Sequence, residues 1–152
     1  MTKKIGVQQS AIAVFLAAVF LIGITDKATA ANDELIKQGQ YMVWAGGCIG
    51  CHTDVKNKKP ELAGGLALKT PFGVFYSPNI TPDKETGIGN WSEDDYESLF
   101  GLGMLPDGDF IGGEMTEVYE NTAKLSDTDR RAMTVYLRSL PAIQNRVSKA
   151  KP

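Results

Sequence analysis

The residues best suited to chemistry lie together in one pentapeptide, Cys48–His52 (CIGCH), which holds both cysteines and the only histidine of the 152-residue chain. Two cysteines separated by two residues and followed directly by a histidine form the C-x-x-C-H pattern of c-type haem attachment. The two thiols can form thioethers to the vinyl groups of one porphyrin, and the histidine can then bind the iron. The pattern therefore predicts one covalently attached haem c held by Cys48, Cys51 and His52.

Two other uses of this pentapeptide are weaker. A thioredoxin-like redox pair requires a strand before the motif and a helix after it in a βαβ unit, whereas the preceding segment reads as a helix. A structural zinc site requires four protein ligands, and the pentapeptide supplies three with no further cysteine or histidine in the chain. With the histidine used by iron, no nucleophile–base pair remains, so we expect an electron carrier rather than an enzyme.

The sixth iron ligand must come from elsewhere, and a methionine sulfur is the usual choice when no second histidine exists. The chain has five methionines: Met1, Met42, Met104, Met115 and Met133. Met1 lies in a segment that we expect to be removed. Met42 and Met133 fall on the covered faces of two predicted helices, where core packing is the simpler role. Met104 and Met115 therefore remain as candidates.

Residues 1–30 read as a secretory signal peptide. Lys3 and Lys4 precede an uncharged apolar run over residues 11–24, and residues 28–30 (ATA) form a small-x-small cleavage site. Because a transmembrane helix needs about 20 residues, the run favours cleavage over the alternative, an uncleaved anchor that would tie the protein to the membrane. We expect residues 31–152 to be an exported, periplasmic domain.

The charges of the chain bear on its partners. Its 16 basic and 18 acidic side chains give a net charge of −2, whereas a nucleic-acid binder needs an excess of basic residues. We therefore expect no nucleic-acid partner. Between Asp83 and Glu120, eleven acidic residues stand against Lys84 alone. This stretch either solvates the surface or steers a basic redox partner.

Helices and loops must position these groups. We expect a first helix capped by Asn32 or Asp33 and ending near residues 46–47, which delivers Cys48. The many glycines and prolines of residues 60–90 predict a wrapping loop without long helices. A short helix is predicted over residues 92–103 and a last helix over residues 126–140, ended by a proline. Between them we expect a further turn around residues 114–121. We expect Gly39 to allow close approach of the last helix near Tyr136. The predicted fold class is all-α, with small helices and loops wrapped around one haem.

These motifs and their order resemble the class I cytochrome c family over residues 32–143. Residues 70–83 (TPFGVFYSPNITPD) and 87–92 (GIGNWS) are similar to haem domains in the cytochrome c subunits of bacterial alcohol and aldehyde dehydrogenases. The resemblance implies the cytochrome c fold and a periplasmic electron carrier. It also implies redox partner proteins: a dehydrogenase as donor, and an oxidase or another cytochrome as acceptor.

The resemblance assigns individual residues as well. It places the sixth ligand at Met115, after a glycine pair and before the final helix, with Met104 as the alternative. The related subunits commonly have proline after this ligand, where the present chain has Thr116. It also implies that a backbone carbonyl near Pro78 accepts the second ring N–H of His52, the alternative being that the proline only shapes a turn.

Three functions from different classes remain. The first is a diffusible electron carrier with histidine–methionine ligation. The second is a tightly bound cytochrome subunit of a dehydrogenase complex, which an exposed apolar patch would favour. The third is a five-coordinate haem that binds gases or reacts with peroxide, which requires that no methionine bind the iron.

Overall fold

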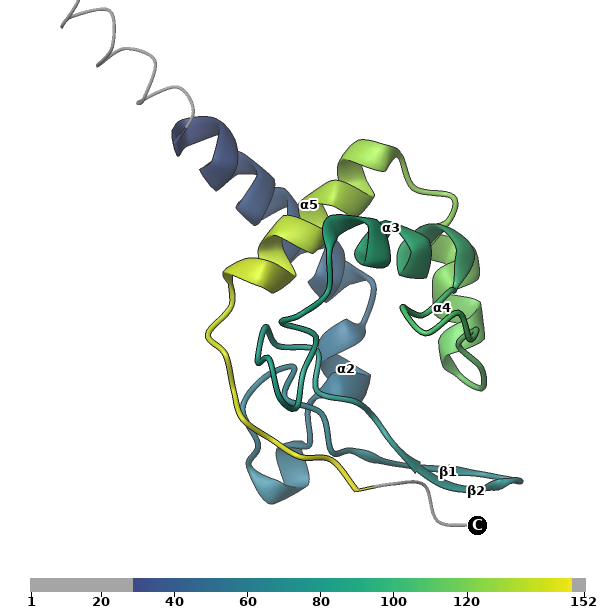
Figure 1. Ribbon diagram of the computed structural model, residues 1–152. Helices are drawn as coiled ribbons and strands as arrows, with labels where there is room; N and C mark the ends of the chain where they lie inside the picture. Colours follow the sequence, from purple (N-terminus) through teal and green to yellow (C-terminus); the bar gives the residue numbers. More distant parts are fainter. Residues whose placement is uncertain (1–28, 149–152) are drawn as a thin grey trace, which may run out of the picture. The chain divides into compact units, whose positions relative to one another are not determined.

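The computed structural model describes residues 29–148 (Figure 1). The chain forms two compact units, Met1–Glu34 and Leu35–Pro152. The first unit is described from residue 29 onward and is helical there. The predicted signal peptide lies outside the described residues except for its last two positions. Within residues 29–148, no helix is both long enough and apolar enough to cross a membrane.

The N-terminal helical segment covers residues 29–45. The prediction that Asn32 or Asp33 caps its start is wrong, because both residues lie inside the helix. Thr29, Ala30 and Ala31 continue it toward the N-terminus, and alanine has the highest helix propensity of any residue. The segment ends at a glycine pair in which Gly47 has a φ of 74°, a left-handed conformation that costs glycine little. Helix α2, Cys48–His52, begins directly after this turn.

Three longer helices follow, two of them where the sequence predicts helices and one, α4, where only a further turn is expected. Helix α3 (Glu93–Leu102) begins at Ser92, which forms a capping box with Asp95, and ends at Gly103 in the left-handed conformation. Helix α4 covers Met115–Thr122. Helix α5 (Asp127–Ser139) begins at Ser126, whose side chain accepts the backbone N–H of Asp129.

The prediction of an all-α chain is wrong in one respect. Within the expected wrapping loop, β1 (Ala67–Thr70) and β2 (Gly73–Tyr76) form an antiparallel hairpin, and a short 3₁₀ helix precedes it at Val55–Asn57. Valine and aromatic side chains in β2 favour a strand, and a two-residue turn joins the pair. The hydroxyl of Thr70 stabilises this turn, accepting the N–H of Phe72 and donating to the carbonyl of Gly73.

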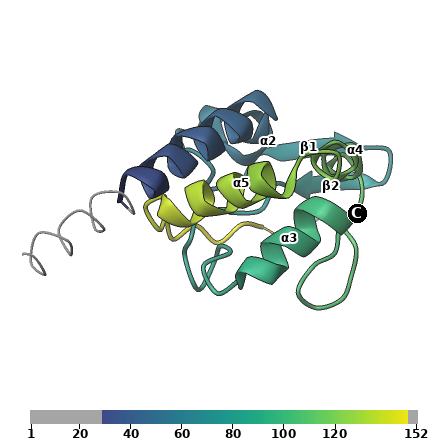
Figure 2. The ribbon, with the colours of Figure 1, turned by 90° about the horizontal axis from the view of Figure 1, so that it is seen from above.

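A buried core joins the helices of the second unit. Gly39 lies against Ala132 and Tyr136 of α5, which confirms the predicted close approach; Figure 2 shows the two helices side by side. Met133 is buried in the core and Met42 packs against it, so both have the packing role expected of them. The buried core residues are Val43, Leu62, Ile88, Tyr96, Phe100, Met133, Tyr136 and Leu137.

Candidate functional site

Helix α2 brings the pentapeptide side chains together. Cys48 and Cys51 are separated by three positions, so both thiols lie on one face of this single helical turn. Both are free thiols, Cys48 half-buried and Cys51 exposed. Burial raises the pKa of the Cys48 thiol, whereas the reactive cysteine of a redox motif needs a lowered pKa. Cys48 is therefore poorly suited to be the reactive thiol of such a motif, and both thiols are free to form thioethers.

His52 is 6% exposed, and one hydrogen bond orients its ring. Its Nδ1 lies 2.8 Å from the carbonyl oxygen of Pro78, which confirms the predicted partner. Because a carbonyl only accepts, Nδ1 must carry the proton. Burial lowers the pKa of His52, against the opposing effect of this hydrogen bond, so the ring is neutral and the lone pair lies on Nε2. A neutral imidazole with a free Nε2 is the form that binds a metal.

Three backbone hydrogen bonds hold the loops around the hydrogen bond between His52 and Pro78. The N–H of Gly64 donates to the carbonyl of His52 at 2.8 Å, and the N–H of Gly65 donates to the carbonyl of Ser77 at 2.8 Å. The N–H of Ile80 donates to the carbonyl of Leu62 at 2.9 Å. The chain from Leu62 to Gly65 is thus clamped between the backbone of His52 and the segment that carries Pro78.

A cavity of about 440 Å³ opens beside Cys48. Its size is typical of sites that hold a cofactor. It is lined by one thiol, by apolar side chains and by a few polar groups: Met42, Ala45, Gly46, Cys48, Glu114, Glu117, Val118, Asn121, Thr122, Leu125 and Met133. Of the pentapeptide side chains, only Cys48 is among the residues that line this cavity; Cys51 and His52 are not. A thiol at the wall of a mostly apolar cavity nevertheless fits a covalently attached haem.

The two candidate sixth ligands lie in different surroundings. Met115 is the first residue of α4, is half-buried, and stands at helical spacing from Val118 and Thr122, both of which line the cavity. Met104 lies in the loop after α3, where its backbone forms an antiparallel bridge with Phe110. Neither methionine is among the residues that line the cavity, but Met115 starts the helix that forms one wall of it. Which of the two binds the iron stays a prediction.

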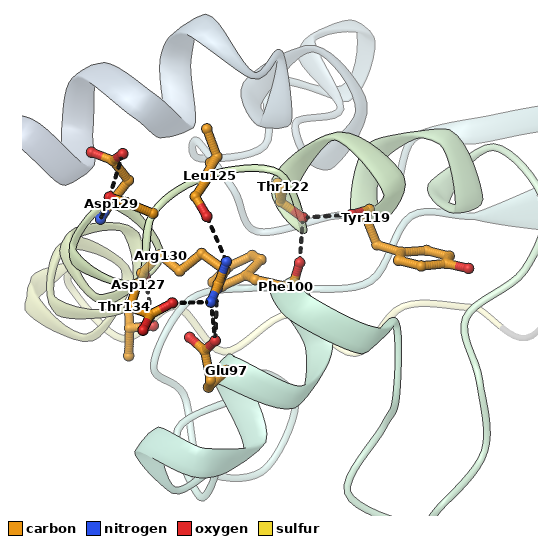
Figure 3. Close-up of polar contacts among 10 residues, drawn as sticks. Glu97, Phe100, Tyr119, Thr122, Leu125, Asp127, Asp129, Arg130 and Thr134 are labelled. Atoms are coloured by element: carbon orange, nitrogen blue, oxygen red, sulfur yellow. Dashed lines mark hydrogen bonds and ion pairs between the residues drawn. The ribbon is translucent and has the colours of Figure 1, made fainter.

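Two side chains that the sequence analysis missed hold α4 in place (Figure 3). The hydroxyl of Thr122 donates to the carbonyl of Phe100 in α3 at 2.8 Å. Arg130 of α5, with a side chain 10% exposed, donates to the carbonyl of Leu125 at 2.6 Å and pairs with Glu97 of α3 at 2.6 Å. The pKa of Arg130 is raised, chiefly by its hydrogen bond with Glu97. Arg130 also pairs with Asp127, three positions earlier, at 2.6 Å. The helical spacing of these two residues is the only sign of this network in the sequence.

The acidic residues between Asp83 and Glu120 have different surroundings in the structure. Glu97 pairs with Arg130, and Glu93 lies 3.7 Å from Arg138, so these two carboxylates are used within the protein. Glu114 and Glu117 are exposed at the wall of the cavity beside Cys48. Exposed negative charge therefore lies at the edge of the candidate haem site.

Comparisons with known proteins agree with this geometry. The family model described as "Cytochrome c" matches residues 36–141. The chain is 41% identical over 128 residues to the gluconate 2-dehydrogenase cytochrome c subunit of Pantoea cypripedii, covering 84% of this chain and 28% of that protein. It is 40% identical over 123 residues to the cytochrome c subunit of the quinone alcohol dehydrogenase of Gluconobacter oxydans, covering 79% of this chain and 25% of that protein. The chain thus spans about a quarter of the length of these relatives.

Proposed function

Because the chain belongs to the cytochrome c family, we propose that it is a periplasmic electron carrier that takes electrons from a dehydrogenase and passes them to a respiratory acceptor. Its prosthetic group is haem c, attached covalently, which supplies an iron that gains or loses one electron at a time. In this proposal, residues 1–30 are a signal peptide and residues 31–152 are the exported domain.

Each residue of the site has its own role in this proposal. Cys48 and Cys51 form the two thioethers, and His52 binds the iron through Nε2 while Pro78 holds its Nδ1–H. Met115 supplies the sixth ligand, and its soft sulfur favours ferrous iron and raises the reduction potential. The observation that carries the proposal is the hydrogen bond between His52 and Pro78, because it presents a neutral, oriented Nε2 beside two free thiols.

A second candidate is a tightly bound cytochrome subunit of a dehydrogenase complex. Tyr41 and Trp44 lie three positions apart on the N-terminal helical segment and are 70% and 53% exposed. Large exposed aromatic side chains on one helix face favour a lasting protein contact. The names of the relatives, which are subunits of dehydrogenases, support the same partner class.

The test is an absorption spectrum of the purified holoprotein in both oxidation states. We expect a low-spin haem whose ferric form shows a methionine–iron charge-transfer band and whose haem stays attached through acid–organic extraction. A high-spin, five-coordinate spectrum would favour a gas- or peroxide-reactive haem instead. To separate the two carrier forms, the double variant Tyr41→Ser, Trp44→Ser is compared with the parent in co-purification with the dehydrogenase. Release of the variant alone would identify a bound subunit.

A further inference from the structure

The segment that follows α5 runs beside the loops of residues 59–86 (Figure 1, yellow). We name residues 141–148 the C-terminal strap. It contains no helix or strand, yet Ile143 is held at both backbone groups. Its carbonyl accepts Nδ2–H of Asn79 at 2.7 Å, and its N–H donates to the hydroxyl of Thr81 at 3.2 Å. Two residues later, the N–H of Asn145 donates to the hydroxyl of Thr86 at 2.9 Å.

Asn79 is the residue that joins the strap to the loop. It is 2% exposed and its amide uses all of its hydrogen-bonding capacity. The amide oxygen accepts the N–H of Thr81 at 3.0 Å and its hydroxyl at 2.7 Å. The amide nitrogen donates to Ile143 and, at 3.1 Å, to the hydroxyl of Thr86. A buried, fully satisfied side chain of this kind fixes the backbone to which it is attached.

Asn79 directly follows Pro78, whose carbonyl accepts the proton of His52. Because proline has no N–H, Pro78 cannot anchor itself through its own amide. It is held through its neighbours instead. On the N-terminal side, the backbone of Ser77 bonds to Gly65 and Leu66; on the C-terminal side, the side chain of Asn79 bonds to the strap.

We propose that Asn79 is a positioning residue, which uses the C-terminal strap to hold the Pro78 carbonyl against Nδ1–H of His52. In this way the strap sets how strongly the imidazole of His52 donates electron density to the haem iron. The proposal rests on the proposed function, in which His52 is the proximal ligand. A strong hydrogen bond at Nδ1 makes the imidazole more basic and stabilises ferric iron. Loosening the strap therefore weakens that bond and moves the reduction potential in the positive direction.

Two variants of the holoprotein release the strap in different ways. Asn79→Ala removes the side chain that joins the strap to the loop, but it also leaves the buried N–H of Thr81 without its partner. Deletion of residues 143–152 leaves Asn79 and the loop sequence intact, so it remains informative if the first variant folds poorly. The controls are Gln144→Ala, which removes only a bond from Gln144 to Glu85 on the surface, and deletion of residues 149–152.

The direct readout is the hydrogen-exchange rate of the His52 Nδ1 proton in the reduced protein, measured by NMR, with the reduction potential as the second readout. We expect exchange faster by on the order of tenfold in both strap variants, a more positive potential, and neither change in the controls. The backbone amides of Met133 and Leu137 in α5 report global opening, and the acceleration at His52 must exceed theirs.

The outcomes separate the two proposals. If the parent has a low-spin haem and a slowly exchanging His52 proton, but the deletion of residues 143–152 changes neither exchange nor potential, the strap is merely structural and the positioning role is wrong. Equal acceleration at His52 and at the α5 amides also overturns it. If the parent itself lacks low-spin haem, the proposed function fails, and the strap proposal fails with it.

Discussion

Gly39 and Ala132 stand so close that a Cβ atom on Gly39 would lie 1.9 Å from the carbonyl oxygen of Ala132. The same atom would lie 2.7 Å from Cβ of Tyr136. Both neighbours belong to α5, and the first is backbone that cannot rotate away. This contact sets how closely the helix that leads into Cys48 can approach the last helix.

Gly39→Ala should therefore destabilise the protein. Adding one methyl group to a filled interface costs about 1–3 kcal/mol, and more where backbone must move. Chemical denaturation of the holoprotein measures the free energy of unfolding. Gly112→Ala is the matched control, because nothing lies within 4 Å of its added Cβ. Equal stability of the two variants would mean that the helices separate at no cost.

Replacing the two cysteines proposed to hold the haem, Cys48→Ala with Cys51→Ala, should abolish stable holoprotein. Without thioethers the haem is held only by its ligands and by apolar contact, and a domain of this size buries a modest core of its own. Acid–organic extraction followed by absorbance of the two phases is the measurement. Haem that stays with the protein in the double variant would refute thioether attachment at these two residues.

Met115→Ala should remove the charge-transfer band of the ferric spectrum and lower the reduction potential, since a thioether ligand favours ferrous iron. Met104→Ala should do neither, because Met104 lies in the loop paired with Phe110 rather than on α4. Spectroscopy and potentiometry on both variants decide the assignment. The opposite pattern would make Met104 the ligand, and no effect in either variant would indicate five-coordinate haem.

Neutralising Glu114 and Glu117 to glutamine should flatten the salt dependence of electron transfer to a basic partner. These acids line the cavity beside Cys48, and their attraction to a partner is screened as the Debye length falls from about 30 Å at 0.01 M to about 10 Å at 0.1 M salt. Stopped-flow rates with the native partner across ionic strength provide the measurement.

The control for that experiment is neutralisation of Glu93 and Asp94, which lie at the start of α3. We expect a smaller change there, with the absorption spectrum unaltered in both pairs. A parent rate that is indifferent to salt, or that rises with it, would mean that docking is apolar or uses basic residues, and the acidic stretch would then be a solvated surface.

Acid should destabilise the fold in part through Asp129. Hydrogen bonds from Ser126 and then from Gln38 lower the pKa of its carboxyl below the ordinary value of 3.8. A lowered pKa in the folded state contributes stability that is complete above the ordinary value and is lost as pH falls through the lowered one. Asp129→Asn should reduce this loss in denaturation curves measured from about pH 6 to pH 2.

Much of this protein is determined by short stretches of sequence. The pentapeptide Cys48–His52 indicates its cofactor chemistry because the required residues are adjacent. The caps at Ser92 and Ser126 are equally local, since each side chain bonds a backbone group three residues away. The resemblance to a known family added the Pro78 carbonyl, which the structure confirms, and the Met115 ligand, which stays a prediction.

The features that the sequence analysis missed depend on contacts between distant segments. The hairpin of β1 and β2 was hidden by the surrounding glycines and prolines, because a strand is stable only once its partner is paired. Arg130 bonds to Glu97 across 33 positions, and Asn79 bonds to Ile143 across 64. Both are ordinary polar residues in the sequence, and only the tertiary structure brings them to partners that satisfy them. No local periodicity or helix or strand propensity signals a hydrogen bond between such distant residues. The bond can stabilise the protein only after folding has brought its two ends together, which costs loop-closure entropy.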